Sequence, residues 1–191
     1  MNRSLLTSLV VLTCVVSTLL ATTASAQTTG DIYTAVAAMK SAGGSTAETP
    51  MAFTIERKMA KREADGLLAA FQTGGAAGLR KALAGVAPTG AVRVGAAKTV
   101  PSRLTFERAT ATGKLITIVT DQPVVFMGIG MPAATAKAGY DFAVVELIVD
   151  AKGNGTGTIA PAAMVTLKQG VFAAADRAAD TIRLTGVTKV R

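Results

Sequence analysis

The chain has 191 residues, of which 50% are hydrophobic and 17% are charged, and its formal net charge is +8. It contains no histidine and a single cysteine, Cys14. This composition excludes Ser-His-Asp and Cys-His nucleophile systems, and zinc or haem sites built on those side chains. A chain of this length is predicted to form one globular domain that is stabilised by apolar burial.

The first 26 residues resemble an export signal. A basic start and an apolar run lead to Ala24-Ser25-Ala26, the small-x-small pattern that a signal peptidase accepts. A retained membrane anchor would need about 20 unbroken apolar residues, and lipid attachment at Cys14 would need a small residue in place of Thr13. We therefore expect cleavage before Gln27 and an exported protein, periplasmic or extracellular, with no disulfide and no membrane span after cleavage.

The predicted elements begin with a polar leader, residues 27–31, and then form one domain, residues 32–191. Residues 32–39 alternate well enough to predict a strand, although their many alanines leave a helix as the alternative. Residues 41–50 are typical of a loop. The sequence MAFTIER, residues 51–57, alternates cleanly and predicts a half-buried strand.

A helix pair is predicted after this second strand. From Lys58 the apolar residues fall at helical spacing as far as Phe71, and Gly74-Gly75 end the first helix. A second short helix spans residues 76–84 and closes at Gly85.

The rest of the chain returns to strand periodicity around one central hairpin. Phe142 to Val149 is almost entirely apolar, Asn154-Gly155 provides a tight turn, and a strand returns to Leu167. Residues 128–139 form a Gly- and Ala-rich loop. Further strands are predicted at residues 91–95, 103–108, 114–120, 124–127 and 181–185.

Short turns between successive strands favour antiparallel neighbours. The predicted fold class is α+β: an antiparallel meander sheet of about seven to nine strands, with a short helix pair inserted after the second strand.

The chain resembles a group of small exported bacterial proteins of uncharacterised function. The similarity is carried by the segments FTIER, QTGG, LRKAL, DAKGNGTG and TIRLTGV, which are spread over most of the chain after the signal. It implies export and a common fold, and it carries over no catalytic or binding residue.

The remaining chemistry rests on carboxylates. Glu107 and Glu146 are the candidate functional residues, because two strand carboxylates in one cleft could act as a glycosidase pair about 5–9.5 Å apart. The alternative is that each is a solvent-facing residue paired with a neighbouring cation. The segment that begins at Asp150 has Lys152 and Pro161 where a calcium loop needs oxygen ligands. We therefore predict no metal and no cofactor.

We expect a non-catalytic, secreted or periplasmic binding or structural module. The alternatives are a carrier of a small apolar ligand in a barrel-like sheet and a carboxylate-based polysaccharide hydrolase. The positive charge favours acidic partners, such as an anionic envelope component. The scattered basic residues and few aromatic side chains argue against nucleic-acid binding.

Overall fold

The computed structural model of the chain describes residues 30–40, 46–124, 139–168, 171–177 and 181–190. In this part of the chain the elements follow in the order β1 (Asp31–Lys40), β2 (Thr46–Ile55), α1 (Lys61–Ala84), β3 (Gly90–Val94), β4 (Val100–Thr110), β5 (Gly113–Thr120), β6 (Phe142–Asp150), β7 (Asn154–Lys168), β8 (Val171–Arg177) and β9 (Ile182–Lys189).

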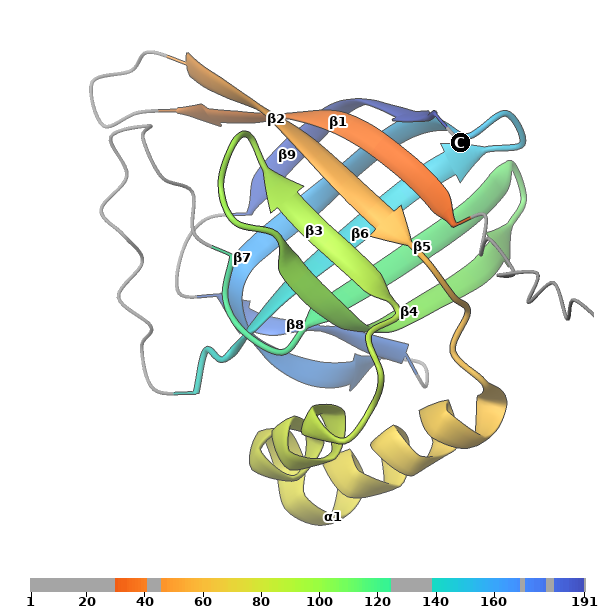
Figure 1. The fold of residues 1–191 in the computed structure, drawn as a ribbon, viewed down its shortest axis with the longest axis vertical. Helices are drawn as coiled ribbons and strands as arrows, with labels where there is room; N and C mark the ends of the chain where they lie inside the picture. Colours follow the sequence, from red (N-terminus) through yellow and green to blue (C-terminus); the bar gives the residue numbers. More distant parts are fainter. Residues whose placement is uncertain (1–29, 41–45, 125–138, 169–170, 178–180, 191) are drawn as a thin grey trace, which may run out of the picture.

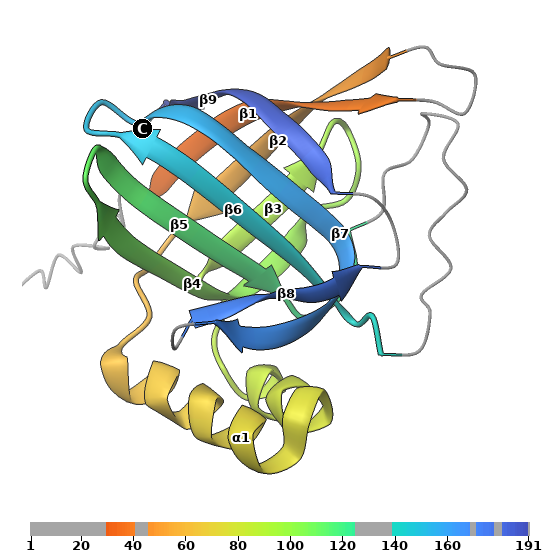
Figure 2. The same ribbon diagram turned by 180° about the vertical axis from the view of Figure 1, so that it is seen from behind.

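Eight of the strands form a closed antiparallel barrel (Figure 1). The strand order β6-β5-β4-β3-β2-β1-β9-β7 is completed by a further pairing of β6 with β7, so that the ring has no free edge. The remaining strand, β8, pairs with the second half of β7. It lies outside the ring, on the side where α1 is found (Figure 2).

Alternation of side chains fills the barrel interior. In β6, Val145, Leu147 and Val149 are buried, while Glu146 and Ile148 point to the outside. The inward positions of the other strands contribute aromatic, aliphatic and small side chains, among them Tyr33, Ala35, Ala37, Met51, Phe53, Ile55, Val92, Ile116, Ile118, Ile159, Ile182 and Leu184. An eight-stranded barrel is just wide enough for such a packed interior.

A second apolar cluster joins α1 and β8 to the outside of the barrel. Leu67, Leu79 and Leu83 are the buried face of the helix. Phe172 of β8 packs edge-to-face against Phe71, with ring centroids 5.6 Å apart, and is stacked on Phe106 of β4 at 6.4 Å. These contacts hold the helix against the wall of the barrel.

Polar contacts fix both ends of the helical segment. Glu63 accepts a hydrogen bond from the backbone N–H of Ala60 at 3.0 Å and two from the Arg57 guanidinium at 2.8 and 3.1 Å. Arg57 also donates to the carbonyl of Ala87 at 2.7 Å. The same arginine therefore ties the entry to the helix to its exit. The hydrogen bond from Arg57 lowers the pKa of Glu63 below its ordinary value.

The structure corrects the predicted fold class. The predicted α+β meander is wrong, because the strands close into a mostly β barrel. Closure follows from β7, whose first half pairs with β6 on one side and with β9 on the other. The Cβ of a non-glycine residue at Gly155 or Gly157 would collide with the backbone of β6, so the two glycines permit this close approach.

The predicted helix pair is also wrong, because a single helix, α1, spans Lys61–Ala84. Only Gly75 leaves the helical conformation, with φ 58° and ψ −149°, so that two helical stretches of this one element meet at a kink.

Two smaller corrections concern strands. Residues 46–50 were predicted as part of a loop, but they extend β2 because they pair with residues 36–40 of β1. Strand β8 was not predicted, because its alanine-rich sequence lacks strand periodicity. The central hairpin is confirmed, with β6 and β7 joined across residues 151–153. The predicted strand at 124–127 and loop at 128–139 lie mostly outside the described residues.

Candidate functional site

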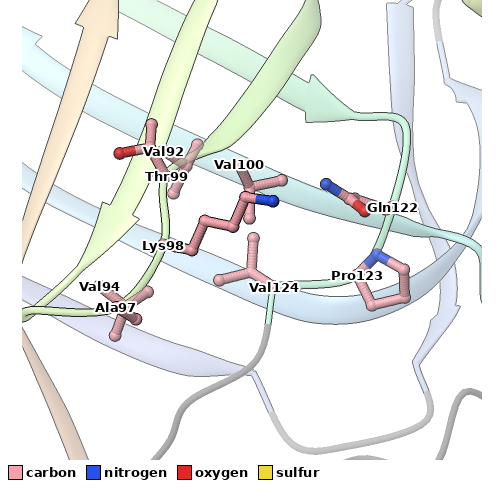
Figure 3. A pocket seen from close by; sticks show the side chains of 9 residues that line it. All are labelled: Val92, Val94, Ala97, Lys98, Thr99, Val100, Gln122, Pro123 and Val124. Atoms are coloured by element: carbon pink, nitrogen blue, oxygen red, sulfur yellow. The ribbon is translucent and has the colours of Figure 1, made fainter.

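A cavity of about 260 Å³ opens at one end of the barrel (Figure 3). We call it the valine pocket, and it is lined by Val92, Val94, Ala97, Lys98, Thr99, Val100, Gln122, Pro123 and Val124. Val92, Val94 and Val124 also belong to the packed interior of the barrel, and Val100 packs against it. The pocket is therefore an apolar opening of the barrel core toward solvent.

The turn between β3 and β4 builds one wall of the pocket. Gly95 adopts a left-handed conformation with φ 52°, which glycine enters at no steric cost. Its N–H donates to the carbonyl of Pro50 at 2.7 Å, and the N–H of Ala97 donates to the carbonyl of Val94 at 2.9 Å. This turn places Lys98 at the rim.

The segment after β5 builds the opposite wall. The hydroxyl of Thr120 donates to the carbonyl of Gln122 at 2.6 Å and accepts a hydrogen bond from the N–H of Ala143 at 3.0 Å. The N–H of Val124 donates to the carbonyl of Pro161 in β7 at 2.9 Å. These bonds hold Val124 against the barrel core, where it is buried.

Polar groups at the pocket are confined to its rim. The exposed Lys98 side chain extends across the valines toward the side where Gln122 lies (Figure 3). An apolar cavity with a few polar groups at its edge is the usual form of a small-molecule site. Its lining residues offer no carboxylate that could act as an acid or base. The pocket is therefore suited to binding.

The other end of the barrel carries a charged cluster, which we define as Asp31, Glu107, Lys114 and Lys189. The Nζ of Lys114 lies 3.3 Å from Glu107 and 3.8 Å from Asp31, and the Nζ of Lys189 lies 2.7 Å from Asp31. Glu107 and Lys114 are opposite the buried residues Ile116 and Val149, which places them at inward positions. Ion pairs thus occupy this end.

The environment of Lys114 favours its charged form. Its Nζ lies 5.8 Å from the centroid of the buried Tyr33 ring. Desolvation opposes the charge, but the Tyr33 hydroxyl and the Glu107 carboxylate outweigh burial and raise the pKa of Lys114. Within the described residues, that hydroxyl makes no hydrogen bond of ordinary geometry. A lysine held charged in this way is a poor nucleophile, so the cluster is suited to a structural role.

The structure does not bring the two predicted carboxylates together. Glu107 belongs to the charged cluster inside one end of the barrel, where it also pairs with Lys58 at 3.3 Å. Glu146 points outward from β6 and lines a shallow groove with Ile148 and Arg183. Because they face opposite sides of the sheet, they share no cleft.

Lys98 and Gln122 were missed by the sequence analysis. Both lie in connections between strands that carry no motif, and nothing in their spacing indicates that β3, β4 and β5 place them at the same barrel end. Within the described ranges, no group of three or more His, Cys, Asp or Glu could hold a metal ion. Among the described residues, no helix is long and apolar enough to cross a membrane.

Comparisons of the chain with protein-family models, with curated proteins and with solved structures find no match.

Proposed function

We propose that this protein is a non-catalytic module that binds a small apolar molecule in the valine pocket. The observation that carries the proposal is an apolar cavity of about 260 Å³ at one end of a closed barrel whose other end is filled by ion pairs. Pockets for drug-sized ligands have volumes of about 300–1,000 Å³. The expected ligand is therefore small.

Three features of the chain support the proposal that the module is non-catalytic. The sequence has no histidine, and its one cysteine, Cys14, lies within the proposed export signal. Glu107 and Glu146 face opposite sides of the sheet. Lys114 is held in its charged form by its neighbours. A nucleophile needs an adjacent base or a lowered pKa, and these residues provide neither.

The proposal places the protein outside the cytoplasm. The basic start, the apolar run and Ala24-Ser25-Ala26 support export with cleavage before Gln27. Amino-terminal sequencing of the protein recovered from periplasm or medium should begin at Gln27. Recovery of the uncleaved chain from the cytoplasm alone would contradict this placement.

Ligand binding is tested with 1-octanol, an uncharged apolar probe, by isothermal titration calorimetry and amide chemical shifts. We expect saturable binding, with the largest shifts at Val94, Val100 and Val124. Substituting Ala97→Phe should fill the pocket and weaken binding by about tenfold or more, because a ligand cannot share the occupied volume.

The matched control is Ala151→Phe in the exposed turn between β6 and β7, at the opposite end of the barrel. This variant should bind octanol like the original protein. Absence of saturable binding, or equal binding by the Ala97→Phe variant with an unchanged melting curve, would refute the proposed pocket.

A further inference from the structure

The ammonium group of Lys98 has no anionic partner among the residues that the structure describes. Asp121 precedes the lining residue Gln122 in the sequence, and its carboxylate accepts a hydrogen bond from the Nε of Arg103 at 2.7 Å. Arg103 is held in place because it also donates to the carbonyl of Val86. Asp121 is therefore already committed to another cation.

The described lining residues of the pocket include no aspartate or glutamate. The lining residues include one charged side chain, Lys98. The positive charge at the rim is thus not balanced by an acidic side chain among the described lining residues.

Gln122 adds a second donor on the same rim (Figure 3). The side-chain amide of Gln122 makes no hydrogen bond with any other described residue. The backbone carbonyl of Gln122 accepts a hydrogen bond from the Thr120 hydroxyl. A glutamine amide offers two N–H donors and an ammonium offers three. One cation and one amide at the edge of an apolar cavity match a head group with a single negative charge.

We infer that the ligand of the valine pocket is a medium-chain carboxylate, whose head group is bound by Lys98 and Gln122 and whose tail lies against the valines. This inference rests on the proposed function and adds the class of ligand. A water-sized group occupies about 30 Å³ in a liquid, so a cavity of about 260 Å³ accommodates about nine heavy atoms. Octanoate has nearly this size.

A carboxylate fits the rim better than a phosphate monoester, which is close to a dianion at neutral pH. Dianionic head groups are usually held by several cations or by arginine forks. Within the described lining, Lys98 is the sole cation. A monoanion is balanced by this one charge, and its two oxygens suit one ammonium and one amide.

The test compares octanoate with 1-octanol, which has the same chain length and no charge, by calorimetry at neutral pH and low salt. A charge-assisted hydrogen bond contributes about 1.5–3 kcal/mol, so octanoate should bind at least about tenfold more tightly than octanol. High salt should reduce this preference. Affinity should rise about fourfold per methylene from butanoate to octanoate and then level off.

The informative variant is Lys98→Met, which keeps an unbranched apolar side chain and removes the charge. We expect it to lose the preference for octanoate over octanol, so that the two probes bind with similar affinity. The matched control, Lys152→Met in the exposed turn at the other end of the barrel, should retain the preference.

The outcomes separate this inference from the function on which it rests. If octanol binds and the Ala97→Phe variant abolishes that binding, but octanoate is no tighter or Lys98→Met leaves its affinity unchanged, the carboxylate inference is overturned and the apolar pocket stands. If neither molecule binds, both proposals are overturned.

Discussion

Leu147 and Ile148 are adjacent in β6, but their side chains lie in opposite environments. Leu147 is 0% exposed inside the barrel, and Ile148 is 55% exposed on the outer face. We expect Leu147→Ala to lower the free energy of unfolding by about 2–5 kcal/mol, because it leaves a cavity in a packed core. Ile148→Ala should change it by no more than about 0.5 kcal/mol. Urea unfolding of both variants measures the difference.

Equal losses in the two variants would contradict the side assignment of β6, and so would a larger loss in the Ile148→Ala variant. Since each substitution removes a similar number of carbon atoms, the comparison reports burial more than residue type.

Single residues were predictable where alternation was strong. The inward side of residues 51–57 follows directly from period two, and the buried strand from Phe142 follows from a nearly continuous apolar run. Glu107 was harder, because a charged residue in an alternating strand usually indicates the solvent face. It occupies an inward position, but it lies at the barrel end, where Lys114 and Lys58 neutralise it. Sequence alone does not say where a barrel ends.

At the scale of the element, the kink of α1 depends on one glycine. Gly75 has φ 58° and ψ −149°, which other residues rarely adopt, whereas Gly74 is free of close contacts and remains helical. We expect Gly75→Ala to lower the free energy of unfolding by about 1–3 kcal/mol. Gly74→Ala should raise it by about 0.5–1 kcal/mol, because alanine loses less backbone entropy in a helix. Thermal and urea unfolding measure both effects.

A stabilising effect of Gly75→Ala would show that the helix straightens without loss of its contacts with β8. The double glycine was visible in the sequence, but its consequence was not. Whether a helix stops or bends there depends on the buried Leu79 and Leu83, which pack beyond the kink and keep the second half of α1 helical.

For the whole molecule, the charged cluster predicts that stability falls at alkaline pH. The folded state raises the pKa of Lys114, so its stabilising contribution is complete below the ordinary lysine value of about 10.4 and is lost as pH rises through the folded-state pKa. We expect the melting temperature to fall above about pH 10.4. The Lys114→Met variant should lose less over this range. Calorimetric melts across the alkaline range measure the difference.

Lys152→Met is the matched control, because Lys152 is exposed and forms no ion pair within the described residues. It should keep the original pH profile. An identical profile for Lys114→Met would mean that the cluster does not stabilise the charged lysine in the folded protein.

Most neighbouring strand pairs could be predicted from the sequence, but the closure of the barrel could not. Short turns predict that β4 pairs with β5 and that β6 pairs with β7. The contacts that turn a meander into a ring are the pairings of β9 with β1 and with β7, which join segments distant in the chain. No local pattern encodes such a pairing.

The pairing of β1 with β9 also affects how the protein reaches its native state. The hydroxyl of Thr185 donates a hydrogen bond to the backbone carbonyl of Val36, which lies 149 positions earlier in the sequence. Contacts between such distant segments slow folding. Strand β1 cannot gain its second neighbour until β9, the last of these strands in the sequence, has been synthesised. During that wait its backbone groups are available to another molecule. The pairing of β1 with β9 thus covers an edge in the finished barrel, but because it forms late, the newly made chain can aggregate through that edge.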